Sequence, residues 1–306
     1  MSVRTGTIAA GALHDQRRGL IGWVLAVAVV ATMYTAFYPS IGAAKFSVML
    51  DAMPEVAKVM GFDKILSASG YVGATVYSLL GAVLVLVCAI SLGARLIAGD
   101  EEAGILELDF SAPVTRDRVF LERLAVLWLT VLMLVLSITT TLLILSSALD
   151  LGLEPAKLIA ARTGLLLFGG AMGTVAFGVG AATGRRGIGI GVASSLSVVA
   201  YLFNYLSPLI DAPWMESFSP FSWYIGNDPL LYGFDGGGLA LLAALAIVAG
   251  GGRLGAVPAS EPDGLNPAVR SLSGRCRDSP AAAVITAPGA SMTWVSAAQR
   301  ARPATG

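Results

Sequence analysis

Charge is scarce in this chain. Only 13% of its 306 residues are Asp, Glu, Lys or Arg, whereas soluble domains contain about 25%. Hydrophobic residues make up 56% of the sequence. One core of a water-soluble chain cannot cover so much apolar side chain, because surface-to-volume scaling limits core size. The composition therefore excludes an ordinary soluble protein and favours an integral membrane protein.

Histidine and cysteine are nearly missing, which removes several kinds of site. His14 is the one histidine, and the two cysteines, Cys88 and Cys276, lie far apart in unlike surroundings. A disulfide framework, a histidine metal cluster and a histidine-based catalytic triad are therefore not expected. The sequence also lacks the Gly-x-x-x-x-Gly-Lys-Ser/Thr pattern of ATPases and the His-Glu-x-x-His pattern of zinc proteases. We expect no enzymatic activity, cofactor or metal in this chain.

Long apolar runs set the architecture. A helix needs roughly 20 residues to cross the hydrocarbon layer of a bilayer. Barrel strands would instead alternate polar and apolar residues over about 10 positions, and no such alternation appears. We therefore predict an all-α polytopic membrane protein with five or six transmembrane helices. Five segments are free of charge and long enough: Gly19–Tyr38, Tyr71–Ala94, Leu124–Leu149, Thr163–Thr183 and Gly187–Ile210.

The last part of the chain is less regular. Leu239–Ala249 is apolar but about half the length of a membrane span. The segment 251–306 is rich in Ala, Gly, Pro, Ser and Arg and has no apolar period, which is typical of disorder. We predict a transmembrane domain over 1–250 and a disordered or aberrant tail over 251–306. A frame-shifted end of a sixth helix and a true flexible tail both fit this pattern.

The placement of Lys and Arg predicts the orientation. With a cytoplasmic N-terminus, the inside segments hold nine of these residues and the outside loops five, as the positive-inside rule requires. We predict a multi-pass protein of the plasma membrane with its N-terminus in the cytoplasm. Arg17 and Arg18 precede the first apolar run as in a signal peptide. The run has the length of a full span and no clear cleavage site, so an uncleaved helix is favoured.

Two short segments between the spans have an amphipathic pattern. Asp100, Glu101 and Glu102 begin one of them, in the loop Arg95–Arg123, and Pro113 ends it; acidic residues suit a helix N-terminus. Such a helix would offer a docking surface to a soluble partner, or it is a solvated loop that its charges keep out of lipid. The second segment, Val48–Met60, has methionines along one face and would lie at the external membrane surface.

These two segments resemble parts of a known family. The first reads Gly-Asp-Glu-Glu-Ala-Gly-Ile-Leu-Glu over 99–107 and Ser-Ala-Pro-Val-Thr-Arg over 111–116. It resembles the cytoplasmic loop of ABC-2 type transporter permeases, and 49–61 resembles the short external helix that many of them carry. The resemblance covers residues 1 to 250. Ile105 departs from the usual Thr of that loop, and Asp109 interrupts a pair that is commonly apolar.

The resemblance implies a permease subunit of an ATP-binding cassette transporter, of the exporting type. It implies two partners: a cytoplasmic ABC ATPase subunit and a second permease copy, in a homodimer or a heterodimer. The loop would act as a cytoplasmic coupling helix, and no nucleic acid is implied. The residues carried over to the ATPase-coupling interface are Glu101, Glu102, Gly104, Glu107, Pro113 and Arg116.

Small and polar residues inside the spans leave two interpretations open. Gly169 and Gly173 form a Gly-x-x-x-Gly pair, whose spacing lets helices approach closely. It marks either packing within one subunit or a dimer face. Asn204 is the main strongly polar side chain inside a span. It either makes a hydrogen bond between helices or lines a translocation path.

Other classes of function remain as alternatives. An ion-coupled secondary transporter is disfavoured, because ionisable residues commonly mark ion pathways and the five spans contain none. A membrane protein with no transport function is the other alternative. The substrate cannot be read from the spans, since related permeases handle drugs, lipids, polysaccharides and peptides.

Overall fold

The computed structural model describes residues 19–39, 67–96 and 116–251. Helices dominate these ranges, and no strand occurs within them. All of these residues belong to one compact unit, Met1–Ala256. The expected external helix at 48–60, most of the expected coupling helix and the tail from 252 onward lie outside the described residues. The predicted division between a transmembrane domain and a tail therefore stays a prediction.

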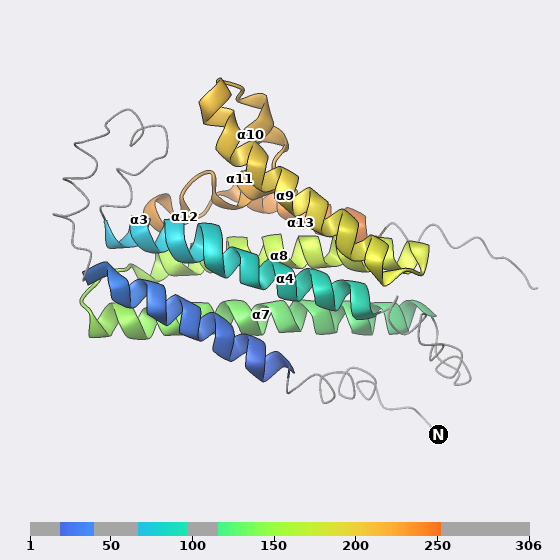
Figure 1. Cartoon of the computed structure of the whole chain (residues 1–306), viewed down its shortest axis with the longest axis horizontal. Helices are drawn as coiled ribbons and strands as arrows, with labels where there is room; N and C mark the ends of the chain where they lie inside the picture. The colour runs from blue at the N-terminus through green and yellow to red at the C-terminus, as the bar shows by residue number, and fades with distance from the viewer. Residues whose placement is uncertain (1–18, 40–66, 97–115, 252–306) are drawn as a thin grey trace, which may run out of the picture. The chain divides into compact units, whose positions relative to one another are not determined.

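Five helices are long and apolar enough to cross a membrane, which confirms the predicted all-α, polytopic fold. The first, Gly19–Pro39, is drawn in dark blue in Figure 1. The second is the continuous run of α3 (Ala68–Val72), η2 (Gly73–Leu80) and α4 (Gly81–Ala94). The remaining three are α7 (Arg116–Ala148), α8 (Pro155–Thr183) and α9 (Arg186–Ile210).

Two spans begin earlier than their charge-free segments do. α7 includes Arg116 through Arg123, and α8 includes Lys157 and Arg162. Long basic side chains can extend from a helix end toward water while their stems lie along apolar surface, so these charges do not stop the helix. α8 starts with Pro155 at a position where proline costs no hydrogen bond. It ends at Gly184, whose φ of +64° suits glycine.

The second span contains a π-helical segment. In η2 the Ser78 hydroxyl donates a hydrogen bond to the carbonyl of Gly73, five residues back, at 2.9 Å. Such segments are rare and release backbone carbonyls from the regular ladder. One carbonyl of this segment, that of Tyr77, accepts a hydrogen bond from the Tyr224 hydroxyl at 3.0 Å. The irregular turn thus joins the second span to a distant part of the chain.

α8 is the central helix of the described unit. In its most apolar stretch 72% of the residues are buried, against 17% for the first span and 22% for α9. α4 approaches α8 so closely that a Cβ on Gly93 would lie 2.2 Å from the Gly173 carbonyl oxygen. A Cβ on Gly169 would lie 2.7 Å from a methyl carbon of Val85. The glycine pair of α8 therefore packs against α4 of its own subunit, one of its two expected roles.

The region after α9 contains further helical structure. It forms three short helices, α10 (Trp214–Phe218), α11 (Pro220–Ile225) and α12 (Pro229–Tyr232). Phe221 and Tyr224 of α11 are buried, and the ring of Tyr224 stacks on Phe168 of α8 at 5.3 Å. The final described helix, α13, spans Gly236–Gly251 in 16 residues. At 1.5 Å per residue it is about 24 Å long, short of a full crossing.

Candidate functional site: the arginine-rich end

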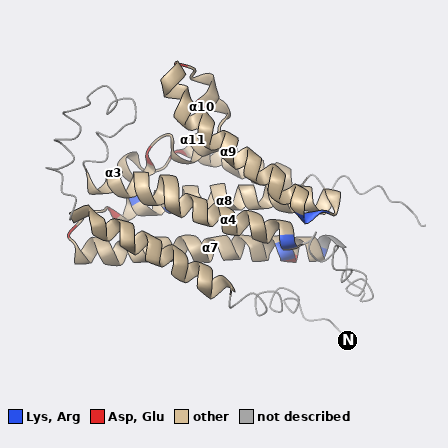
Figure 2. Ribbon diagram, in the orientation of Figure 1, with Lys and Arg blue, Asp and Glu red and all other residues tan. Residues whose placement is uncertain are grey.

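Charge in the described residues separates between the two ends of the spans, as Figure 2 shows. The arginine-rich end comprises the end of α4, the start of α7 and the turn between α8 and α9. Its basic residues are Arg95, Arg116, Arg118, Arg123, Arg185 and Arg186. The acidic end comprises the α7–α8 turn and the segment from the end of α9 to the start of α13. Its charged residues are Asp150, Glu154, Lys157, Arg162, Asp211, Glu216, Asp228 and Asp235.

Arg123 is the buried member of the arginine-rich end, with 7% of its surface exposed. Its guanidinium donates a hydrogen bond to the carbonyl oxygen of Leu96. Leu96 lies two residues beyond the end of α4, and Arg123 lies two turns into α7. A charged donor to a buried carbonyl is among the stronger hydrogen bonds of proteins. The contact therefore holds together the two helices that flank the loop 97–115.

Further contacts fix the start of α7. The Arg118 guanidinium pairs with the Glu122 carboxylate at 3.1 Å, one turn apart. This pair is partly exposed, so it adds little to stability. Phe120 packs on Phe177 of α8 with ring centroids 4.7 Å apart. The start of α7 is thus held against α4 by Arg123 and against α8 by Phe120.

The turn between α8 and α9 is tight. Gly184 closes α8 through a backbone hydrogen bond of 2.9 Å to Gly180, and α9 starts at Arg186. A Cβ on Gly189 would lie 2.6 Å from the Ala176 carbonyl oxygen, so α9 leaves the turn pressed against α8. Glycine here serves helix packing. A nucleotide-binding loop would need a preceding strand, and the described residues contain none.

The structure locates only part of the expected coupling interface. Arg116 is the first residue of α7. The other members, Glu101, Glu102, Gly104, Glu107 and Pro113, lie outside the described residues. What the structure adds is the frame on either side of them. That frame depends on Arg123, whose role sequence reasoning missed, because its spacing from the other arginines resembles that of any basic segment beside a membrane.

Asn204 lies on the inward face of α9. The buried residues of this helix are Gly189, Ala193, Ser197, Ala200 and Ser207. Asn204 is four residues beyond Ala200 and three before Ser207, so it continues the same face. It is only partly buried, and it makes no side-chain hydrogen bond within the described residues. Of its two expected roles, an interhelical hydrogen bond is not seen in this part of the chain.

Hydroxyl groups join the helices toward the acidic end. Ser219 donates a hydrogen bond of 2.6 Å to the Ala200 carbonyl, and Tyr71 donates one of 3.1 Å to the Tyr34 carbonyl. The Tyr224 hydroxyl donates to Tyr77, as described above. Burial raises the pKa of Tyr224 well above its ordinary value, so the phenol stays protonated and remains a donor at neutral pH. These ties involve no charged side chain.

The described residues define a class of protein. The described part of the chain is a polytopic α-helical membrane protein with its arginines at one end of the spans. Those residues contain no group of three or more His, Cys, Asp or Glu side chains that could hold a metal ion.

Comparison with protein families then identifies the chain. The model of the ABC-2 family transporter protein matches residues 7–225, and the chain belongs to this family. The match confirms the resemblance to ABC-2 type permeases and supports a membrane permease of an ABC transporter. Searches of curated proteins and of solved structures each give no match.

Proposed function

We propose that this chain is the permease subunit of an ABC exporter and that it is driven by a separate cytoplasmic ATPase. The ATPase docks on the loop at 99–116, and two permease copies form the translocation path. The observation that carries this proposal is the contact between Arg123 and Leu96. It holds the two ends of the loop region in a fixed relation, so movement of a docked partner is passed to α4 and α7 together.

The charge distribution supports a cytoplasmic position for the docking site. Basic residues near membrane spans favour the cytoplasmic side, whereas acidic residues contribute little to orientation. Six arginines lie at the arginine-rich end, against Lys157 and Arg162 at the acidic end, within the described residues. The loop 97–115 connects α4 to α7 at the arginine-rich end. The same charge bias supports a cytoplasmic N-terminus in this proposal.

ATP hydrolysis belongs to the partner in this proposal. The chain lacks the phosphate-binding pattern of ATPases, and permeases of this family act as membrane subunits without that activity. A bound ATPase changes the permease only if it contacts two states of the spans with different affinity. α4 and α7 are suited to such a change, since both pack directly on the central helix α8.

The proposal is tested by reversing charge in the docking loop. The tagged chain is purified in mild detergent from its own cells, and ABC ATPase polypeptides are identified by mass spectrometry. We expect an ATPase to accompany the unmodified chain and to be lost from the variant carrying Glu101→Lys and Glu102→Lys. Glu216→Lys, an exposed reversal at the acidic end, serves as the control and keeps the ATPase. Retention of the ATPase by the double variant contradicts docking through this loop.

A further inference from the structure

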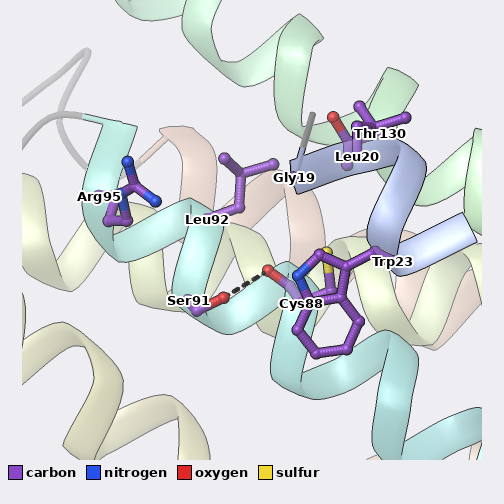
Figure 3. Close-up of a pocket in the computed structure, with 8 residues that line it drawn as sticks. All are labelled: Gly19, Leu20, Trp23, Cys88, Ser91, Leu92, Arg95 and Thr130. Carbon is purple, nitrogen blue, oxygen red and sulfur yellow. Dashed lines mark hydrogen bonds between the residues drawn. The ribbon is translucent and has the colours of Figure 1, made fainter. Parts of the chain in front are cut away.

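A cavity of about 260 Å³ lies between the first span, α4 and α7. Figure 3 shows the residues that line it. They are Gly19, Leu20, Trp23, Cys88, Ser91, Leu92, Arg95 and Thr130. Leu20 and Gly19 begin the first span, and Arg95 follows α4 directly. The cavity is therefore near the arginine-rich end of the spans.

The Thr130 side chain in this cavity lacks a partner. It is 97% buried, since only 3% of its surface is exposed, and its hydroxyl makes no hydrogen bond. Threonines within helices ordinarily bond to the carbonyl four residues back. Thr139 does so on the same helix at 2.9 Å, and Thr174 does so on α8 at 2.7 Å. An unpaired buried hydroxyl is costly, and an acceptor oxygen bound in the cavity would remove that cost at Thr130.

Two more hydrogen-bond donors line the cavity. Trp23 has an indole N–H, and Arg95 has a guanidinium; neither has an acceptor or an ion-pair partner within the described residues. Ser91 is already occupied, because its hydroxyl donates to the Cys88 carbonyl at 3.0 Å (Figure 3). No carboxylate is among the lining residues of the described ranges. Free donors with one positive charge match a ligand that is anionic and rich in oxygen.

The size of the cavity and its apolar wall further restrict the kind of ligand that fits. Pockets for whole drug-sized ligands have about 300–1,000 Å³, so this cavity suits a small polar group. Leu20, Leu92 and the ring of Trp23 form its apolar part. Tryptophan is enriched at the level of lipid headgroups, and basic pockets between transmembrane helices bind anionic headgroups. A phospholipid would place its phosphate among the donors and its acyl chains along the exposed helix faces.

We propose that this cavity binds the phosphate-bearing headgroup of an anionic membrane phospholipid. Arg95 provides the charge, and Trp23 and Thr130 donate hydrogen bonds to the phosphate or ester oxygens. The proposal goes beyond the coupling to an ATPase and does not depend on it. A lipid bound in this cavity would join the first span to α4 and α7. The first span has the smallest share of buried residues among the five spans.

The test measures lipid binding by the purified full chain. Native mass spectrometry in detergent compares phosphatidylglycerol with phosphatidylcholine of the same acyl chains. We expect preferential binding of phosphatidylglycerol. We expect Arg95→Gln to weaken it about fivefold, the usual weight of one cation beside anionic lipid. Thr130→Val keeps the side-chain shape and removes the hydroxyl donor, and Trp23→Phe keeps an aromatic ring and removes the indole N–H. We expect each to weaken binding about threefold.

Arg185→Gln is the matched control, because Arg185 is exposed at the same end and does not line the cavity. It leaves the preference unchanged. Equal loss in Arg95→Gln and Arg185→Gln, or equal binding of the two lipids, overturns the site. Water-soluble glycerol phosphate is added as a competitor. If it displaces the lipid at millimolar concentration, the cavity binds a free phosphate ester and the lipid proposal is wrong. Thr130→Val that raises thermal stability without changing lipid binding also contradicts it.

Discussion

The two ends of the spans are held together by different chemistry. At the arginine-rich end, the buried charged side chain of Arg123 joins α7 to the segment that follows α4. At the acidic end, the links come from neutral hydroxyls of Ser219, Tyr71 and Tyr224, each donating to a carbonyl. A hydrogen bond from a charged donor is stronger than one between neutral groups. We infer that the arginine-rich end transmits force and the acidic end maintains the fold.

The largest effect is expected from Arg123→Met. The change leaves the buried Leu96 carbonyl without its charged donor, and loss of such a bond costs about 3 kcal/mol. We expect a lower thermal unfolding temperature in detergent and, in the complex, a severalfold loss of ATP turnover coupled to transport. Arg185→Gln is the control at the same end, where the side chain is exposed. If the two variants have the same unfolding temperature and the same ATP turnover, the buried contact of Arg123 contributes neither to stability nor to coupling.

The glycine contact at the same end gives the next effect. A Cβ at position 93 would lie 2.2 Å from the Gly173 carbonyl oxygen, so Gly93→Ala forces α4 away from α8. Overpacking of this kind costs about 2 kcal/mol. Gly191→Ala on α9 is the matched control, because no atom lies within 4 Å of its added methyl group. Thermal unfolding of both variants checks the difference, and an unaltered Gly93→Ala protein would refute the close approach.

A smaller effect is expected from Tyr224→Phe. The variant keeps the stack on Phe168 and removes the hydrogen bond to Tyr77. Hydrogen bonds between transmembrane helices contribute about 0.6 kcal/mol on average. We expect a small loss of stability and normal ATPase co-purification. Loss of the ATPase in this variant would show that the acidic end takes part in coupling, against the division drawn above.

The smallest effect on stability is expected from Asn204→Leu. The Asn204 side chain is partly exposed and has no hydrogen bond within the described residues, so its removal changes stability by less than about 0.5 kcal/mol. We propose that Asn204 lines the translocation path, and we therefore expect slower transport at unchanged stability. Transport assays with the complete complex check this. A clear loss of stability with normal transport would assign Asn204 a structural role.

The spans could be predicted because lipid imposes a strict rule on sequence. Every span must satisfy its backbone internally and carry few charges, and these demands leave long apolar runs that composition reveals. The charge-free segments begin at Leu124 and Thr163, later than the helices, which start at Arg116 and Pro155. The sequence does not show these earlier starts, because a basic side chain near a helix end is compatible with both loop and helix. The π-helical segment could not be predicted from the sequence, since its residues suit an α-helix equally well.

The functional details depend on contacts between distant residues, and these leave little trace in one sequence. Arg123 reads as one more surface arginine until α4 is placed beside it. The segment of α11 reads as a polar loop with aromatic residues, yet Phe221 and Tyr224 pack into the core. Thr130 reads as an ordinary helix residue. The coupling residues Glu101 and Glu102 came from a family resemblance, and their contacts remain predictions.

Cysteine labelling tests the central claim most directly. In a background with Cys88→Ala and Cys276→Ser, single cysteines are introduced at Glu102 and at Glu216. A membrane-impermeant maleimide is applied to intact cells and to inside-out vesicles. The account predicts labelling of Glu102→Cys only in inside-out vesicles, reduced when the ATPase is bound, and labelling of Glu216→Cys only in intact cells. Labelling of Glu102→Cys from outside intact cells would contradict it.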